Sequence, residues 1–132
     1  MIIHVLPGDA QVEDFTKVGL EGEIVVCREA LVQGEVRAES LDEFWDVRER
    51  VHAENQSDAR YRETVVSEFE KLLNLTGGTE VDLWFEYELF CQVNLWFCVW
   101  LRRRCRTRRF RWSPSGTGAV LTRFLGFRFA SP

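Results

Sequence analysis

Three short runs rich in β-branched and aromatic residues, each followed by a segment with a different periodicity, constrain the fold of this chain most. The runs are IIHVL at 2–6, EIVVC at 23–27 and EVDLWF at 80–85. The second is nearly continuously apolar, which is typical of a strand buried on both faces. Strands separated by helices favour a parallel sheet with helices covering it.

The segments after these runs space their apolar residues by three or four, as helices do. The predicted helices cover 12–18 with a stop at Gly19, about 41–54 after the capping box Ser40–Glu43, a segment from Asp58 to Gly77-Gly78, and 89–101. The sequence therefore predicts a small three-layer (Rossmann-like) α/β domain, with a mainly parallel sheet of about three strands and helices on its faces.

The charge of the chain is divided between two unlike parts. Residues 1–100 contain 8 Lys and Arg against 21 Asp and Glu, whereas residues 101–132 contain nine Arg and no acid. With 132 residues, 45% of them apolar, the chain can build one core. We expect a single α/β domain over 1–100 and an atypical Arg-rich tail over 101–132.

Two interpretations of the tail stay open. A GC-rich reading frame read out of phase yields such a bias, so the tail is hypothesised to be frameshifted, otherwise non-native or disordered. Alternatively, its arginines, interleaved with aromatic residues such as Phe110 and Trp112, would contact phosphates and stack on bases. The acidic domain beside it disfavours a nucleic-acid partner, and would equally well attract the tail itself.

Several kinds of site are disfavoured by the spacing of their residues. The cysteines form no C-x-x-C pair, and His4 and His52 lie far from them in the sequence, so we predict no metal site and no disulfide framework. We interpret the thiols as reduced, small buried side chains, although Cys91, Cys98 and Cys105 recur every seven residues. A G-x-G-x-x-G motif and a P-loop ending are both missing, so no cofactor is predicted.

The apolar stretch 83–101 precedes three arginines and therefore requires a test as a membrane span. Glu86 and Glu88 argue against it, since each carboxylate in a membrane would cost about 2–3 kcal/mol. The opening MIIHVLPGDA lacks the basic start and long apolar core of a signal peptide. We expect no membrane association and a cytoplasmic location.

Four blocks of sequence, in this order, resemble a bacterial family known as domain of unknown function 1835. They are HVLPGDA at 4–10, EGEIVVCREALVQG at 21–34, FWDVR at 44–48 and LWFEYELFCQVNLW at 83–96, and the likeness covers about residues 1–98. The resemblance implies a compact bacterial α/β domain and supplies no activity. It places Gly8-Asp9, Arg28-Glu29, Arg48 and 86–92 on the family's motif positions.

Charged residues follow each predicted strand, where ligands bind in open parallel sheets. The candidate ligand-binding residues are Asp9, Arg28, Glu29, Arg48, Glu86, Glu88 and Gln92. Each has a structural alternative. Asp9 would cap a helix, and Arg28 would pair internally with Glu29 or Glu86. Glu86 and Glu88 are spaced for acid/base catalysis or Mg²⁺ binding. The alternative is that a carboxylate there stabilises the positive N-terminal end of the following helix. Trp45 either stacks on Arg48 at the surface or packs over the sheet.

Two classes of function follow from these observations. The first is a domain, enzyme or sensor, that binds a small polar ligand at the carboxyl ends of the strands. The second is a protein-interaction or regulatory module whose aromatic helix packs on a partner or on a missing C-terminal region, or self-associates through Trp96, Phe97 and Trp100. The sequence decides neither whether the chain is an enzyme nor which substrate it takes.

Overall fold

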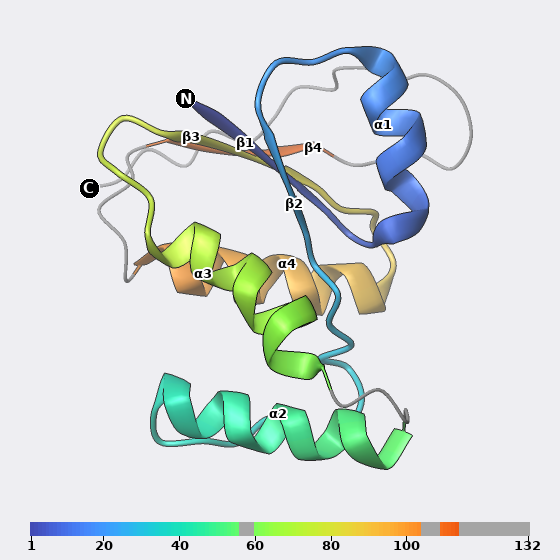
Figure 1. The fold of residues 1–132 in the computed structure, drawn as a ribbon, viewed down its shortest axis with the longest axis vertical. Helices are drawn as coiled ribbons and strands as arrows, with labels where there is room; N and C mark the ends of the chain where they lie inside the picture. The colour runs from blue at the N-terminus through green and yellow to red at the C-terminus, as the bar shows by residue number, and fades with distance from the viewer. Residues whose placement is uncertain (56–59, 104–108, 114–132) are drawn as a thin grey trace.

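The sheet is parallel throughout, with the strand order β2-β1-β3-β4 (Figure 1). The computed structural model describes residues 1–55, 60–103 and 109–113. In this part of the chain the strands are β1 (Ile2–Leu6), β2 (Glu23–Val26), β3 (Glu80–Trp84) and β4 (Arg109–Ser113). The first three lie where the sequence predicts them, which confirms the α/β fold class with a parallel sheet.

A fourth strand extends the sheet beyond the three strands that the sequence predicts. β4 pairs with β3, Glu80 lying opposite Arg109 and Trp84 opposite Ser113, and it belongs to the segment 101–132 that the sequence sets apart as a tail. The residues RFRWS alternate arginine with aromatic side chains. That alternation has the period of a strand, a signal that the prediction of three strands does not use.

The helices follow the predicted segments, with one different end. They are α1 (Val12–Val18), α2 (Leu41–Asn55), α3 (Ser67–Leu73) and α4 (Leu89–Arg103), with short turns η1 (Asp9–Gln11) and η2 (Arg62–Val66). Gly19 ends α1 in the left-handed conformation, and Ser40 Oγ accepts a hydrogen bond from the Glu43 N–H at 3.1 Å, as the capping box predicts. The helix before Gly77-Gly78 ends earlier, at Leu73, and its predicted start at Asp58 lies outside the described residues.

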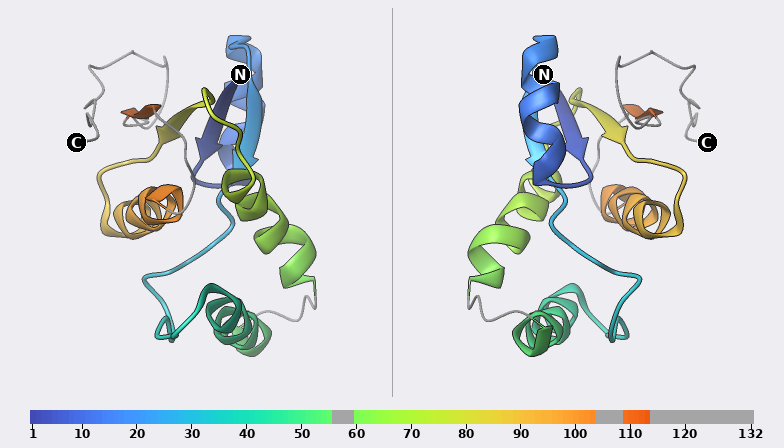
Figure 2. Two further views of the ribbon diagram at one scale, coloured as in Figure 1. Left: turned by 90° about the vertical axis from the view of Figure 1, so that its left-hand side faces the viewer. Right: turned by 90° about the vertical axis from the view of Figure 1, so that its right-hand side faces the viewer.

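The chain order explains which helix covers which face of the sheet. The connection from β1 to β2 moves to one side of β1, and the connection from β2 to β3 moves to the other. Because such crossovers are right-handed, α1 lies on one face and α3 and α4 on the opposite face (Figures 1 and 2). α2 lies beyond α3 and α4, farther from the sheet.

The two faces of β1 enter two separate cores. Ile3 and Val5 join the large core, which contains side chains from α2, η2, α3 and α4. Leu6 points the other way and packs with Phe15 of α1 and Trp84 of β3. Burial of both faces explains why β1 and β2 have apolar residues at consecutive positions.

Aromatic and sulfur side chains fill the large core. Trp45 is buried and stacks on Phe69 of α3, with ring centroids 5.6 Å apart, so it packs between helices and forms no surface pair with Arg48. Cys27, Cys91 and Cys98 are free and buried, which confirms their interpretation as small buried side chains. Cys105 lies outside the described residues.

α4 has one buried side and one exposed aromatic side. Leu95, Cys98 and Leu101 are buried, whereas the side chains of Trp96 and Trp100 are 60% and 42% exposed. None of the helices in residues 1–55 and 60–103 combines the length and apolar character needed to cross a bilayer.

Candidate functional site

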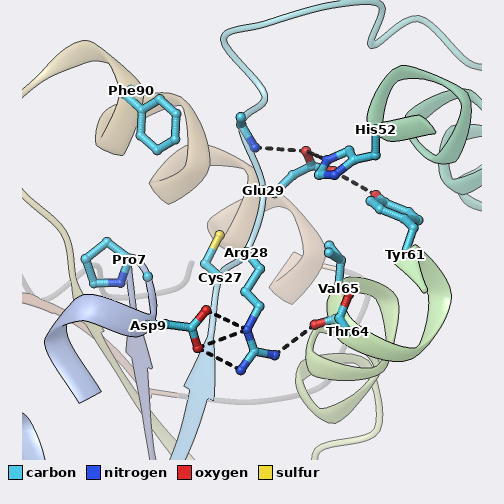
Figure 3. A pocket seen from close by; sticks show the side chains of 12 residues that line it. Pro7, Asp9, Cys27, Arg28, Glu29, His52, Tyr61, Thr64, Val65 and Phe90 are labelled. Atoms are coloured by element: carbon cyan, nitrogen blue, oxygen red, sulfur yellow. Dashed lines mark hydrogen bonds and ion pairs between the residues drawn. The ribbon is translucent and has the colours of Figure 1, made fainter. Parts of the chain in front are cut away.

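A pocket of about 520 Å³ lies at the carboxyl ends of β1 and β2 (Figure 3). Its size falls within the range of about 300–1,000 Å³ that is usual for small-molecule sites. Open parallel sheets bind ligands outside the carboxyl ends of their strands. The lining residues are Pro7, Gly8, Asp9, Cys27, Arg28, Glu29, Ala30, His52, Tyr61, Thr64, Val65 and Phe90.

Asp9 and Arg28 form an ion pair at the edge of this pocket (Figure 3). Arg28 Nη2 and Nε donate to Asp9 Oδ1 at 2.9 and 3.1 Å, and Nε also approaches Oδ2 at 3.0 Å. The hydrogen bond from Arg28 lowers the pKa of Asp9. Since neither η1 nor α1 has a side-chain cap, Asp9 serves as the partner of Arg28 and caps neither helix. The prediction that Arg28 pairs with Glu29 or Glu86 was therefore wrong.

The third contact of Arg28 comes from a π-helical turn. Arg28 Nη1 donates to the backbone oxygen of Thr64 at 2.9 Å, and Thr64 belongs to η2, which has π-helical hydrogen bonding over Arg62–Val66. π-helical turns are rare in proteins overall, and those that occur often lie at functional sites. The Arg28 guanidinium is thereby held between the Asp9 carboxylate of η1 and the backbone of η2.

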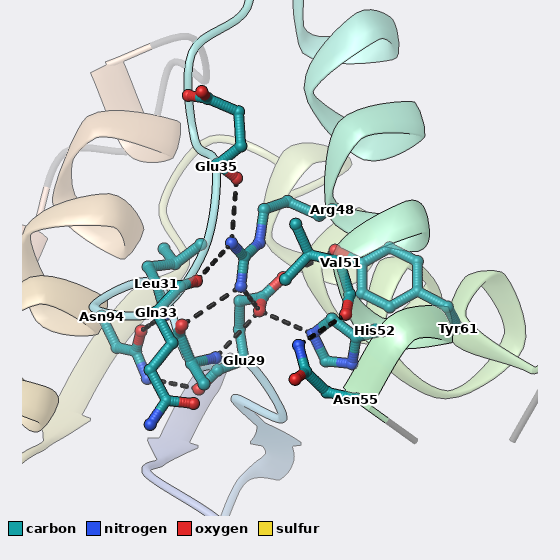
Figure 4. A network of polar contacts seen from close by, with 11 residues as sticks. Glu29, Leu31, Gln33, Glu35, Arg48, Val51, His52, Asn55, Tyr61 and Asn94 are labelled. Carbon is teal, nitrogen blue, oxygen red and sulfur yellow. Dashed lines mark hydrogen bonds and ion pairs between the residues drawn. The ribbon is translucent and has the colours of Figure 1, made fainter. Parts of the chain in front are cut away.

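Glu29 is the centre of a buried polar network behind the pocket (Figure 4). Its Oε1 accepts hydrogen bonds from Arg48 Nη2 at 2.7 Å, His52 Nε2 at 2.8 Å and the Ala30 N–H at 2.8 Å, while Oε2 accepts from the Tyr61 hydroxyl at 2.7 Å. Burial pushes the pKa of Glu29 upward, but the hydrogen bonds outweigh it and the pKa is lowered. Burial and the Glu29 charge raise the pKa of Tyr61 far above its ordinary value.

Arg48 connects this carboxylate to the loop between β2 and α2. Its side chain is 1% exposed, and its Nη1 donates to the backbone oxygens of Gln33 at 2.7 Å and Glu35 at 3.0 Å. Arg48 does not line the pocket. We therefore assign it to holding Glu29 and the loop in place, and not to contact with a ligand.

Asn94 of α4 holds the same loop from the other side. Its Nδ2 donates to the Glu29 backbone oxygen at 2.7 Å, and its Oδ1 accepts from the Leu31 N–H at 3.3 Å. These two bonds satisfy a fully buried amide.

Glu86, Glu88 and Gln92 lie at the start of α4 and do not line the pocket. Gln92 Nε2 donates to the Glu86 backbone oxygen at 2.7 Å. Glu88 is exposed and its Oε1 lies 3.5 Å from Cys91 Sγ. The structure thus brings Asp9, Arg28 and Glu29 together but leaves these three outside. Within the described residues, His, Cys, Asp and Glu side chains form no cluster suited to a metal ion.

Sequence reasoning missed His52, Tyr61, Thr64 and Asn94. His52 follows Arg48 by four residues, which places both on one side of α2, and this spacing was a usable signal. Tyr61 occupied an apolar position of a predicted helix. Thr64 contributes through its backbone oxygen, for which the sequence has no signal.

Comparison with family models, with curated proteins and with solved structures found no match to this chain.

Proposed function

We propose that this chain is a small-ligand-binding α/β domain whose ligand occupies the pocket at the carboxyl ends of β1 and β2. The observation that supports this proposal most is the position of the Asp9 and Arg28 pair on the wall of that pocket. It is accessible, because the two side chains are 66% and 34% exposed. A guanidinium in such a place suits a carboxylate or a phosphate.

The alternative role for these charges is purely structural, and burial separates the two roles. The Glu29 and Arg48 side chains are 0% and 1% exposed, as expected for a pair that organises the fold. The Asp9 and Arg28 pair is far more exposed, and exposed pairs contribute only about 0–1 kcal/mol to stability. A stabilising role alone gives little reason for its place in the pocket.

The test is binding by variants at and away from the pocket. The purified chain is screened by native mass spectrometry against defined carboxylates, phosphates and polyols. We expect Arg28→Ala to lose binding with little change in melting temperature, and Glu86→Ala, outside the pocket, to bind as wild type does. A large loss of folding by Arg28→Ala would instead indicate a structural pair.

Two further parts of the proposal concern origin and location. The resemblance of residues 1–98 to domain of unknown function 1835 is part of the proposal, and its motif positions Gly8-Asp9 and Arg28-Glu29 are pocket residues here. Buried free thiols at Cys27, Cys91 and Cys98 support a cytoplasmic location. The proposed contact of the tail with nucleic acid stays a prediction, since the tail's side chains lie outside the described residues.

A second candidate function is self-association through the exposed side of α4. Trp96 is 60% and Trp100 42% exposed, whereas Phe97 packs against the large core and stacks on Trp100 with centroids 5.8 Å apart. Exposed aromatic surface of this kind favours a partner. Light scattering after size exclusion should show a dimer that Trp96→Ser abolishes; a monomer at all concentrations would contradict this candidate.

A further inference from the structure

The hydrogen bonds of Glu29 fix the positions of two protons beside the pocket. An ionised carboxylate only accepts hydrogen bonds, so His52 Nε2, 2.8 Å from Oε1, must carry a hydrogen. The Tyr61 hydroxyl donates its hydrogen to Oε2 at 2.7 Å. Since Glu29 is held in its ionised form by four donors, both hydrogens stay directed at it.

This arrangement leaves the Tyr61 hydroxyl with acceptor capacity. A phenolic oxygen that donates its hydrogen keeps its lone pairs. Tyr61 lines the pocket, and its oxygen therefore favours a ligand that supplies O–H or N–H donors.

Asp9 and Arg28 add one acceptor and one cation. The contacts of Arg28 with Asp9 and Thr64 use three of its five N–H groups. The remaining two N–H groups have no partner among the residues that the structure describes. The Asp9 carboxylate is 66% exposed, so solvent or a hydroxyl group can reach its oxygens.

We propose that the ligand is a small hydroxylated anion, with its carboxylate or phosphate on Arg28 and its hydroxyl groups on Asp9 and Tyr61. This inference rests on the proposed function and specifies the chemistry of the same pocket. An anion without hydroxyl groups leaves the acceptors unused, and a neutral polyol leaves the guanidinium unused. The two features together define the class.

The experiment separates charge from hydroxylation with six-carbon probes. Gluconate has both features, hexanoate has only the charge, and sorbitol has only the hydroxyl groups. Isothermal titration calorimetry of the full chain should show gluconate binding at least about ten-fold more tightly than either partial probe. Sorbitol 6-phosphate in the same series decides whether carboxylate or phosphate is preferred, and the inference holds if either one meets that margin.

Variants then assign the charge to Arg28. Arg28→Gln should lose at least about ten-fold of the affinity for the preferred anion and leave sorbitol unchanged. Arg62→Gln is the matched control, because Arg62 is also partly exposed and ion-paired, with Asp46 and Glu49, and does not line the pocket. It should bind as wild type does.

The outcomes distinguish the two levels of the proposal. The hydroxylated-anion inference is overturned if hexanoate or sorbitol binds as tightly as both hydroxylated anions. It is also overturned if Arg28→Gln loses no affinity for the anion. A ligand-binding pocket remains in both cases. Binding of none of the four probes would also overturn the inference. The proposed function itself fails only if the wider mass-spectrometric screen detects no ligand that depends on Arg28.

Discussion

Asp9 and Glu29 both follow a parallel strand, yet their surroundings give them different roles. Asp9 is an accessible carboxylate with one cationic partner, whereas Glu29 is wholly buried and receives four hydrogen bonds. The sequence placed both at strand ends correctly. It could not separate their roles, because the partners Arg48, His52 and Tyr61 come from helices far along the chain and only packing brings them together.

The difference between the two ion pairs predicts different effects on stability. Arg48→Met removes one member of a buried pair and should cost about 3–5 kcal/mol in the free energy of unfolding, since a buried carboxylate loses its cation. Arg28→Ala breaks an exposed pair and should cost less than about 1 kcal/mol. Urea unfolding of both variants measures this; equal losses would contradict the assignment of Arg48 as structural.

Acid should weaken the fold through Glu29. The folded-state pKa of Glu29 is lowered, so its contribution to stability is present above the unfolded value of about 4.3 and is lost as pH falls through the folded value. Tyr61→Phe removes one hydrogen bond that holds this pKa down. The variant should lose about 1–3 kcal/mol at pH 7. Because its folded-state Glu29 pKa lies closer to the unfolded value, its stability should fall less between pH 7 and pH 3 than that of wild type.

Urea unfolding at a series of pH values from 7 to 3 tests this prediction. Tyr87→Phe is the matched control, because the Tyr87 side chain is exposed, and its curve should follow wild type. If Tyr61→Phe and wild type respond to acid identically, Glu29 does not control the acid sensitivity.

At the scale of elements, the sequence predicted what depends on local pattern. Apolar runs located β1 to β3, and a capping box located α2. The end of the helix at Leu73, ahead of the Gly77-Gly78 stop, and the π-helical turn at Arg62–Val66 had no such signal. A π-helical turn depends on how η2 packs against its neighbours, and spacing by three or four fits it as well as an ordinary helix.

Gly22 controls how β2 meets β1. Its φ is +140°, and a Cβ added there would lie 2.7 Å from the Ile2 backbone oxygen. Backbone atoms in a sheet cannot move aside, so Gly22→Ala should cost about 2–4 kcal/mol in the free energy of unfolding. Gly77→Ala, where a Cβ would have no atom within 4 Å, should change it by less than about 1 kcal/mol. Thermal unfolding of the two variants checks the contrast, and similar losses would contradict it.

At the scale of the whole molecule, the strand order places the pocket. β2 and β3 both lie beside β1, so the ends of β1 and β2 come together with the start of α4, which follows β3. The sequence predicted that charges would gather at this edge, and the structure gathers Asp9, Arg28 and Glu29 there. Glu86 follows β3 but lies outside the pocket, because α4 begins there and the backbone of Glu86 turns toward Gln92.

The origin of the Arg-rich segment is a separate question for the whole molecule. β4 takes residues 109–113 of this segment into the sheet beside β3, whereas the frameshift hypothesis concerns the gene. Sequencing the source locus past residue 101 in all three frames should show a reading frame that continues the acidic domain. Confirmation of the present frame would end that hypothesis.

The central claim is that a small ligand binds at the carboxyl ends of β1 and β2. The most direct measurement is a heteronuclear NMR titration of the ¹⁵N-labelled full chain with the tightest ligand from the mass-spectrometric screen. The claim predicts that the amide shifts concentrate at Gly8, Arg28 and Phe90 and are lost in Arg28→Ala. Shifts confined to the exposed side of α4 around Trp96, with those pocket amides unmoved, would contradict it.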